Sequence, residues 1–343
     1  MIEQTPDCLR IVAAGGGTGL STLLHGLKRY AYSAGRPAPG GPLVDIAAVV
    51  TVTDDGGSSG RLRRDFEVLP PGDIRNCMVA LSEDETLLSR LFQYRFASGR
   101  GLKGHSFGNL FLTALTHVTG DFALAVKESS EVLAIKGRIY PCTASDVIVE
   151  AELDNGEKVS GETKISRSRS RIRRISLKPS GCGPLKETLE AIEAADLISF
   201  GPGSLFTSVI PNLLVEGIPD AIRNSRAVKA YFVNLMWQPG ETVDFSAADH
   251  VAAIYEHAGA KLFDYVVLNT RPMGASLLYR YAEEQARPVE NDMERLESMG
   301  VKIIARDLLQ EAKKIRHNPE AIADVAIELA REGRRRRLAA QCV

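Results

Sequence analysis

The feature that most constrains the fold is a recurring unit of a short apolar run, a glycine-rich loop and a helical pattern. The first unit joins "LRIVAA" to "GGGTGL" and "STLLHGLKRYAY", and further apolar runs occur at "IAAVVTVT", "LISF", "KAYFVNLM", "YVVLNT" and "VKIIARDL". Such alternation is typical of a parallel sheet covered by helices on both faces. The sequence therefore predicts an α/β fold, a Rossmann-like, doubly wound and mostly parallel sheet.

The middle of the chain changes from this pattern to strand-like alternation. Residues 138–180 alternate around Asn155-Gly156, a dipeptide that favours a hairpin, and then carry the basic stretch "SRSRSRIRR". We interpret them as an inserted β-rich subdomain. A single Rossmann-like nucleotide-binding domain then comprises residues 1–137 and 181–333. Residues 334–343 are a basic C-terminal tail, in which four consecutive arginines end the last helix and are solvated.

Composition excludes several other classes of protein. The 42 Lys and Arg residues against 43 Asp and Glu residues give a net charge of -1, so no global charge recruits nucleic acid or a membrane surface. No apolar stretch approaches the roughly 20 residues of a membrane span, and "MIEQTPDCLR" lacks a signal-peptide pattern. The 5 scattered cysteines, without C-x-x-C spacing, favour reduced thiols. We expect a cytoplasmic protein that binds no nucleic acid.

Three glycine-rich loops follow predicted strands, at Gly15–Gly19, Asp54–Gly60 and Gly201–Ser204. Parallel strands bring such loops to one edge of the sheet, where ligands bind in doubly wound folds. Glycine lets backbone N–H groups approach a phosphate, and a helix N-terminus adds positive potential. Neither G-x-x-x-x-G-K-[ST] nor G-x-G-x-x-G is present. One loop alone could be a tight turn, but three at one edge predict a nucleotide-like ligand.

Carboxylates accompany two of these features. Asp54 and Asp55 close the second strand, where they would accept hydrogen bonds from ribose hydroxyls or hold Mg²⁺ with water and substrate phosphate. The pair could instead form a turn, but the following "GGSSG" is more than a turn needs, so we favour ligand contact and leave the metal open. Asp73 begins a predicted helix and either contacts the same crevice or only caps that helix.

Other polar residues allow both a functional and a structural interpretation. Asn109, at the start of a helix in "GHSFGN", is a credible polar contact, whereas His105 as a general base is the minority interpretation. His250 and His257 lie two helical turns apart with no third ligand, which favours histidines on a helix surface over a metal site. Ser204 is outside a G-x-S-x-G motif, so a hydroxyl that contacts phosphate is favoured over a nucleophile.

Six motifs resemble one family, and the similarity runs in order from about Leu9 to the last strands near Asp307. They are "VAAGGGTGLSTLLHGLK", "VVTVTDDGGSSGRLRRDF", "PPGDIRNCMVAL", "GHSFGNLFL", "ISFGPGSLFTSVIPNLLV" and "FVNLMWQPGET". The family is the YvcK, or gluconeogenesis factor, family, a branch of the CofD-like superfamily with a Rossmann-type α/β fold and added elements. The full set of motifs is specific, whereas any single one is not.

The resemblance implies a function as well as a fold. YvcK-like proteins are cytoplasmic bacterial binders of UDP-sugars such as UDP-N-acetylglucosamine. They support cell-wall synthesis and cell shape during growth on gluconeogenic carbon sources, with protein partners in that regulation, and a homo-oligomer is left open. Their enzymatic relatives, the 2-phospho-L-lactate transferases, move phospholactate from a GDP-linked donor onto a deazaflavin precursor with Mg²⁺. The motifs look like the YvcK branch, so the resemblance favours a binding regulator, with the transferase as the alternative.

The resemblance carries ligand binding over to the glycine loops and to several polar side chains. Together with Asp73, the predicted ligand-binding residues are Gly15, Gly16, Gly17, Thr18, Gly19, Asp54, Asp55, Asp73, Asn109, Gly201, Pro202, Gly203, Ser204 and Asn234. Asp54 and Asp55 are the metal candidates, and no catalytic residue is assigned. The family usually reads "NLMTQPGET", but Trp237 replaces that threonine here. If position 237 lines the pocket, the indole stacks on a base or narrows the sugar site.

Overall fold

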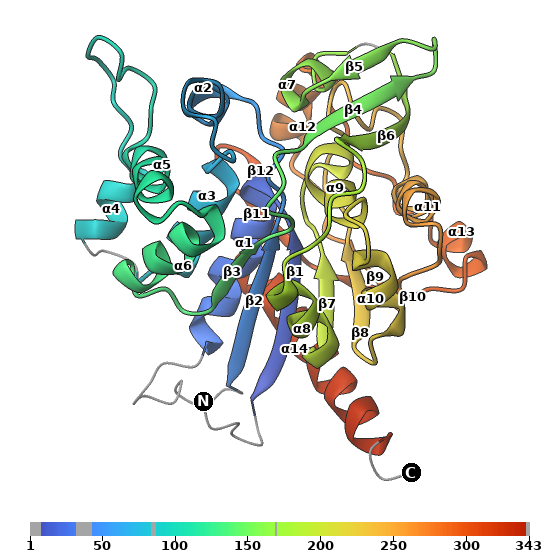
Figure 1. Ribbon diagram of the computed structural model, residues 1–343. Coiled ribbons are helices and arrows are strands. Elements are labelled where there is room, and N and C mark those ends of the chain that lie inside the picture. The colour runs from blue at the N-terminus through green and yellow to red at the C-terminus, as the bar shows by residue number, and fades with distance from the viewer. Residues whose placement is uncertain (1–7, 32–42, 84–86, 169, 341–343) are drawn as a thin grey trace.

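The computed structural model describes residues 8–31, 43–83, 87–168 and 170–340 (Figure 1). A 7-stranded sheet has the order β10-β9-β8-β7-β1-β2-β3, and every neighbouring pair is parallel. Its strands are β1 (Leu9–Gly15), β2 (Val44–Val50), β3 (Arg138–Pro141), β7 (Leu197–Phe200), β8 (Val228–Phe232), β9 (Tyr265–Asn269) and β10 (Lys302–Arg306). This confirms the predicted α/β fold. The order reverses between β1 and β7, which places the ligand crevice of such sheets at their carboxyl ends.

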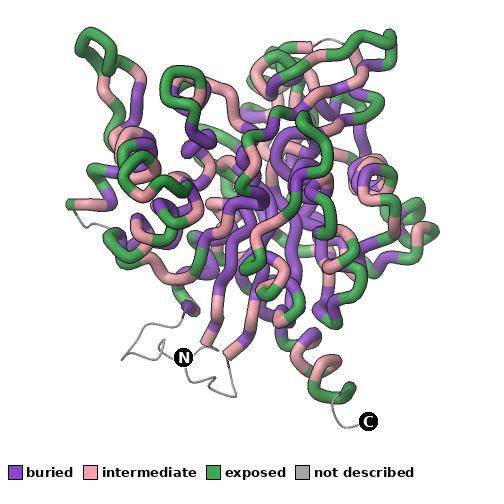
Figure 2. The backbone as a smooth tube through the Cα atoms, viewed as in Figure 1, coloured by how far each residue is buried: buried purple, intermediate pink, exposed green. Residues whose placement is uncertain are grey.

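Helices cover both faces of this sheet. On one face α1 (Gly17–Leu27), α3 (Gly72–Leu81) and α14 (Pro319–Ala339) pack against each other and the strands, and α8 (Lys186–Ala194) and α10 (Ile218–Asn224) lie on the other face (Figure 1). The remaining helices are η1 (Lys28–Tyr30), α2 (Gly57–Phe66), α4 (Leu87–Gln93), α5 (Phe107–Thr119), α6 (Phe122–Val132), η2 (Leu205–Val209), α9 (Ile210–Leu213), α11 (Ala247–Ala258), α12 (Ala275–Glu283) and α13 (Met293–Ser298). Buried residues concentrate along the central strands (Figure 2).

The first helix begins earlier than the sequence predicted. Leu20, Leu24 and Leu27 repeat at helical spacing and are fully buried, each contributing roughly 1.5–3 kcal/mol. The helical pattern "STLLHGLKRYAY" begins at Ser21, which would put Ser21 and Thr22 in the first turn. Instead both hydroxyls donate to carbonyls four residues earlier, at 2.9 and 2.8 Å. The helix therefore starts within the glycine loop itself, at Gly17.

The middle of the chain forms a separate small antiparallel sheet above the carboxyl ends of the main strands (Figure 1). Its strands are β4 (Ile148–Leu153), β5 (Lys158–Ser160) and β6 (Ile172–Lys178), and the short helix α7 (Glu162–Ile165) follows β5. Gly156, at φ 81°, makes the predicted hairpin turn. The strand β3 belongs to the main sheet, so the small sheet begins after it.

The arginine run was predicted to end the last helix, but it lies within that helix. The helix α14 begins after the cap Asn318 and continues to Ala339. Arg334 and Arg337 approach the fully buried carboxylate of Asp196 at 3.6 and 2.9 Å. This buried charge accounts for two of the arginines, and they are therefore not simply solvated.

Two further expectations concern loops and the membrane. The predicted second glycine loop is shortened, because α2 begins inside it at Gly57. The Gly- and Pro-rich stretch "SAGRPAPGGPLVD", whose composition is typical of a loop, falls largely on residues 32–42, which lie outside the described residues. A β-hairpin of β11 (Leu309–Glu311) and β12 (Ile315–His317) precedes α14.

In the described ranges no single helix is long and apolar enough to cross a membrane. The segments Leu205–Leu213 and Ile218–Asn224, which form a bent pair, together meet that criterion by length and composition only.

Candidate functional site

The first glycine loop lies at the junction of β1 and α1. The strand ends at Gly15, Gly16 is the N-cap residue in extended conformation, and no side chain caps the helix. A Cβ on Gly16 would lie 2.6 Å from Asp73 Oδ2, and one on Gly19 would lie 2.1 Å from the carbonyl oxygen of Pro202. Only glycine allows both approaches. The loop can therefore present backbone N–H groups and the positive end of α1 to an anion.

The third glycine loop meets the first one and is held by the side chains of Asn234 and Gln238. Asn234 Nδ2 donates to the Gly203 carbonyl at 2.8 Å, and the Gly203 N–H donates to Asn234 Oδ1 at 3.1 Å. Gln238 Nε2 donates to Ser204 Oγ at 2.5 Å. Because the amide of Asn234 is used in this way, the residue positions the loop. The hydroxyl of Ser204 faces the pocket that the two loops share.

That pocket has a volume of about 280 Å³. It is lined mainly by Gly16–Gly19, Pro202–Ser204, Asn234–Gln238, Tyr281 and Ile315–His317. Eight of the predicted ligand-binding residues therefore meet here: Gly16, Gly17, Thr18, Gly19, Pro202, Gly203, Ser204 and Asn234. The pocket combines a glycine cradle suited to phosphate with the rings of Trp237 and Tyr281 and the guanidinium group of Arg316.

The predicted carboxylates lie beside the cradle and do not line this pocket. Asp73 accepts a hydrogen bond from the Gly17 backbone, so it touches the first loop directly. Asp54 Oδ1 accepts from the Gly56 N–H at 2.8 Å. Asp55 Oδ1 accepts from both the N–H and the hydroxyl of Thr163, at 2.8 and 2.6 Å. The inserted subdomain is thereby tied to the second loop.

Burial and mutual repulsion raise the pKa of Asp54, Asp73 and Glu162. Burial, and next the charge of Asp54, raise the pKa of Asp73 to about 7. Burial also raises the pKa of Asp54 and, with the help of Asp54 and Asp73, raises that of Glu162 in α7 to about 9. Glu241 is similarly raised to about 7, mainly by burial. The site can therefore donate hydrogen bonds from carboxylic acids at neutral pH.

A metal ion does not have a ready set of ligands here. Asp54 and Asp55, the predicted metal candidates, already accept hydrogen bonds from protein N–H and hydroxyl groups. Across the described ranges, no group of three or more His, Cys, Asp and Glu side chains is arranged to hold a metal ion. The donor set does not fit a resident Mg²⁺, which prefers several free oxygen ligands.

Asn109 lies near the carboxylates at the start of α5. Ser106 caps this helix by accepting from the Asn109 N–H at 3.1 Å. The Asn109 side chain is 2% exposed and donates through Nδ2 to Ser59 Oγ at 3.4 Å, while its Oδ1 has no hydrogen-bond partner. His105 Nδ1 is 3.0 Å from Ser58 Oγ, and burial lowers its pKa. Asn109 thus keeps one buried acceptor unused beside the second loop.

The prediction of surface histidines on α11 was wrong. His250 is fully buried, and its ring stacks on Tyr231. His257 accepts a hydrogen bond at Nε2 from the Ile175 N–H at 3.0 Å, which satisfies an N–H of β6. Burial lowers the pKa of both histidines, so both are neutral packing residues. The helix turns this face inward because the main sheet and the insert both pack against it.

The sequence analysis missed four residues of the site. Tyr281 lies within α12, Arg316 in β12, and Glu162 and Thr163 in α7, so none of the four lies in a loop that directly follows a strand of the main sheet. Their local sequences carry no phosphate or sugar signature. The fold also brings the aromatic rings of Trp237 and Tyr281 to the pocket.

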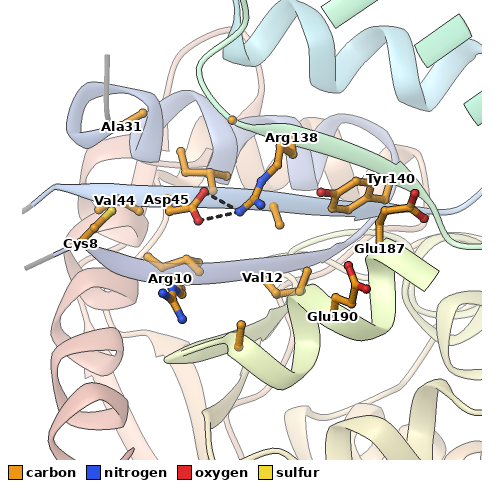
Figure 3. A pocket seen from close by; sticks show the side chains of 16 residues that line it. Cys8, Arg10, Val12, Ala31, Val44, Asp45, Arg138, Tyr140, Glu187 and Glu190 are labelled. Carbon is orange, nitrogen blue, oxygen red and sulfur yellow. Dashed lines mark hydrogen bonds and ion pairs between the residues drawn. The ribbon is translucent and has the colours of Figure 1, made fainter. Parts of the chain in front are cut away.

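A larger cavity, of about 480 Å³, opens at the amino-terminal ends of β1, β2 and β3 (Figure 3). There Arg138 donates to both carboxylate oxygens of Asp45, at 2.7 and 2.6 Å, while Glu187 and Glu190 of α8 line the other wall. This is the end of the sheet opposite the glycine loops. Its rim includes Cys8, which borders residues outside the described ranges, so we assign this cavity no ligand.

Comparison with known proteins identifies clear relatives. A family model described as 2-phospho-L-lactate transferase CofD matches residues 11–309. The chain is similar to the gluconeogenesis factor of Bacillus subtilis (strain 168), with 46% identity over 325 residues, covering 94% of this chain and 98% of that protein. The gluconeogenesis factor of Halalkalibacterium halodurans is 45% identical over 319 residues, covering 93% and 95%.

A solved structure shares both sequence and fold with this chain. The crystal structure of a UPF0052 family member from Bacillus halodurans superposes with a TM-score of 0.87 and 44% identity. The superposition covers 94% of this chain and 99% of that one. The whole architecture, and not the glycine loops alone, is therefore shared.

Proposed function

The chain belongs to the gluconeogenesis factor family of CofD-like proteins, and from that premise we propose that it is a cytoplasmic regulator that binds a nucleotide-sugar. The ligand is a UDP-sugar, with UDP-N-acetylglucosamine as the first candidate. Its binding would serve wall synthesis and cell shape during growth on gluconeogenic carbon sources, through protein partners. The ligand and the physiological role come from the family resemblance, whereas the site chemistry supplies the support.

The observation that carries this proposal is the cradle made by two glycine loops. Gly19 and Pro202 are so close that no Cβ fits between them, and both loops face one pocket. Backbone N–H groups at the start of α1 favour a diphosphate, since anions are stabilised at a helix N-terminus. Arg316 lines the same pocket and is exposed, so its charge can reach a second phosphate.

A regulator must also report that its ligand is bound. A ligand shifts a conformational equilibrium only by its differential affinity for the two states. The site joins three separate parts of the fold, because the cradle, the insert and the β11–β12 hairpin all reach its surroundings. Ligand that bridges these parts would change their relative stability, and a protein partner could bind the bridged state.

The alternative is a Mg²⁺-dependent transferase of phosphorus-containing groups. The matching family model, described as 2-phospho-L-lactate transferase CofD, favours it. That reaction requires Mg²⁺ at Asp54 and Asp55 and an acceptor next to the diphosphate. The hydrogen bonds that both carboxylates already accept make the binding role the better proposal.

A titration of the full chain tests the proposal. Thermal unfolding is measured with UDP-N-acetylglucosamine, UDP-glucose, GDP and NAD, each with and without Mg²⁺. A ligand at 100 times its Kd adds about 2.7 kcal/mol, which is a shift on the order of 2–4 °C per kcal/mol. Stabilisation by UDP-sugars without metal supports the regulator. Stabilisation by GDP only with Mg²⁺ would replace it with the transferase, and no shift with any nucleotide would contradict both.

A further inference from the structure

We propose that helix α4 and the loop that follows it form a docking surface for an acidic, amphipathic segment of a protein partner. This α4–α5 surface combines an apolar stripe with a group of cations, and its residues are Leu87, Leu91, Tyr94, Arg61, Arg95, Arg100 and Lys103. The loop, residues 94–106, projects from the molecule above α5 (Figure 1). None of these residues lines the glycine-loop pocket. The inference rests on the proposed function only in that a regulator needs a partner.

The first part of the surface is the apolar stripe along α4. Leu87, Leu91 and Tyr94 follow one another at helical spacing, and the Tyr94 N–H donates to the Leu91 carbonyl at 3.0 Å, which continues the last turn. Their exposed fractions are 75%, 38% and 52%. The other face of α4 packs inward through Ser89 and Phe92, which are buried. Large apolar side chains that are exposed together on one helix face indicate a contact surface for a protein.

The second part is a group of cations at the returning arm of the loop. Arg61 of α2 donates to the Lys103 carbonyl at 2.9 Å, and its Nη2 lies 3.2 Å from the position of a Cβ on Gly104. Arg95 donates to the Gly104 carbonyl at 2.6 Å. Both guanidinium groups therefore lie at Gly104. Within the described ranges, neither these two arginines nor Arg100 and Lys103 pair with a carboxylate.

The positive charges act on their neighbours. Burial, and next the charge of Arg61, lower the pKa of His105, and Arg95 adds to this effect while Asp65 opposes it. Burial and then Arg95 also lower the pKa of Arg75. Guanidinium groups that repel other cations and have no carboxylate partner favour an anion that binds between them. Carboxylates of a partner would supply that anion, since they accept two parallel hydrogen bonds from arginine.

The loop is held in shape before any partner binds. Arg95 and Ser106 form an antiparallel bridge across it, and the Phe96 N–H donates to the His105 carbonyl at 2.9 Å. His105 Nδ1 lies 3.0 Å from Ser58 Oγ, which ties the loop to α2. A segment that is already ordered loses little conformational entropy on binding. The surface is therefore suited to recognition in the form that the structure shows.

The arrangement favours a protein segment over other anionic partners. A segment that inserts into a membrane presents its apolar side chains to the lipid, whereas residues 98–101 at the tip of this loop are polar or glycine and Leu102 follows them. Nucleic acid would use the cations and the ring of Tyr94 but leave Leu87 and Leu91 uncovered. A second copy related by two-fold symmetry would bring like charges together.

Three fluorescent peptides test the surface on the unmodified protein. They are synthetic helices of equal length: the first has leucines on one face and glutamates on the other, the second has glutamine for glutamate, and the third has alanine for leucine. Fluorescence anisotropy measures their binding to the full chain. We expect the first to bind at least about tenfold more tightly than either of the others, and less tightly as salt is raised. Equal binding of the first two peptides, or no binding of the first, would overturn the proposal.

Two changes on the surface locate the binding. The double variant Arg95→Gln with Lys103→Gln should weaken the first peptide about tenfold, because two charge pairs are lost. Leu91→Ser should weaken it by about the same factor through lost apolar burial. The three side chains are exposed, so the thermal unfolding temperature should stay unchanged. The peptide comparison on the unmodified protein does not depend on these variants.

Matched control variants lie on α14. Arg331→Gln with Arg335→Gln removes the same charge from exposed positions, and Leu338→Ser removes a leucine that is 50% exposed. These controls should change the affinity for the first peptide by less than about twofold. Equal losses in the surface and control variants would show that the peptide responds to total charge or general stickiness, which would contradict a site at α4.

The remaining measurements identify a different occupant. Phosphatidylglycerol vesicles and a single-stranded oligonucleotide are tested in place of the peptides, and sedimentation equilibrium gives the oligomeric state. Binding of vesicles or oligonucleotide that Arg95→Gln with Lys103→Gln abolishes, without binding of the first peptide, would overturn the proposal. So would a dimer that Leu91→Ser dissociates. Binding of UDP-N-acetylglucosamine is measured separately, and its absence would end the regulator proposal while the peptide result stands.

Discussion

Asn234 and Gly203 form a reciprocal pair of hydrogen bonds, 2.8 Å from the amide Nδ2 to the glycine carbonyl and 3.1 Å from the glycine N–H to Oδ1. The pair links the segment after β8 to the loop after β7. The side chain of Asn234 therefore helps to hold the third glycine loop in place.

Asn234→Ala should lower the free energy of unfolding by roughly 1–3 kcal/mol, because two loop groups lose their partner. Nucleotide affinity should fall as well, since the loop is no longer held in place before the ligand binds. Urea unfolding and calorimetry measure the two effects. Asn224→Ala, at an exposed asparagine of α10, is the control and should change neither. An unchanged affinity for Asn234→Ala would show that the loop keeps its shape without the pair.

Gly19→Ala should separate the two glycine loops. The added Cβ would lie 2.1 Å from the carbonyl oxygen of Pro202, which is backbone and cannot rotate away. We expect a loss of roughly 1–3 kcal/mol in unfolding free energy from overpacking and a loss of phosphate binding. The matched control is Gly183→Ala, where a Cβ meets nothing within 4 Å. If Gly19→Ala bound the ligand with the affinity of the unmodified protein, the close contact between the two loops would not be needed for binding.

Arg316→Ala should weaken UDP-sugar binding about tenfold, because the pocket loses a guanidinium group that can pair with a phosphate. The affinity should also depend less on salt concentration, since salt screens the attraction between exposed charges. Affinity is measured by calorimetry at two salt concentrations. Arg335→Ala, at an exposed arginine on α14, changes the net charge equally and should have no effect. If both variants behave alike, the effect belongs to total charge and not to the pocket.

Asp196→Asn should destabilise the fold strongly. The carboxylate is fully buried, accepts from the Arg10 N–H at 2.9 Å, and pairs with Arg337 at 2.9 Å. Removing one partner of a buried pair leaves an uncompensated charge and costs about 3–5 kcal/mol. Chemical denaturation measures the loss. Asp220→Asn, in an exposed pair with Arg223, should cost far less, and similar losses in the two variants would contradict a structural role for the arginine run.

Glu162 should make stability fall as pH rises. Its pKa is raised from 4.5 to about 9, so the folded state holds a proton that the unfolded state has lost between these values. Unfolding free energy contributed by this group is therefore complete below pH 4.5 and declines toward pH 9. Glu162→Gln, which stays neutral, should gain stability relative to the unmodified protein as pH rises from 5 to 9, in denaturation curves at each pH.

The control for this pH dependence is Glu256→Gln, at an exposed carboxylate of α11, whose stability difference should stay constant with pH. A constant difference for Glu162→Gln as well would place the titrating group elsewhere. Asp73 and Glu241, both raised to about 7, contribute in the same direction and remain in both variants.

Local sequence was sufficient wherever one chain segment dictates its own structure. The apolar runs of β1 and β2 and the Asn155-Gly156 turn formed as predicted, because each depends on neighbours within a few residues. The end of α14 was mispredicted for the converse reason. Its arginines are ordered by Asp196, which lies more than a hundred positions away in sequence, and a local pattern cannot show that partner.

The sequence by itself determined the parallel α/β sheet, the glycine loops at the ends of its strands and the family. These follow from periodicity and from glycine's small size, which are properties of short segments. Only the tertiary structure decided what surrounds the loops. Asn234 hydrogen-bonds the third glycine loop, and Tyr281 and Arg316 line the pocket. Glu162 of the inserted subdomain interacts electrostatically with Asp54 and Asp73. Burial and long-range contact set those roles, and both depend on how distant segments pack together and not on the residues beside them.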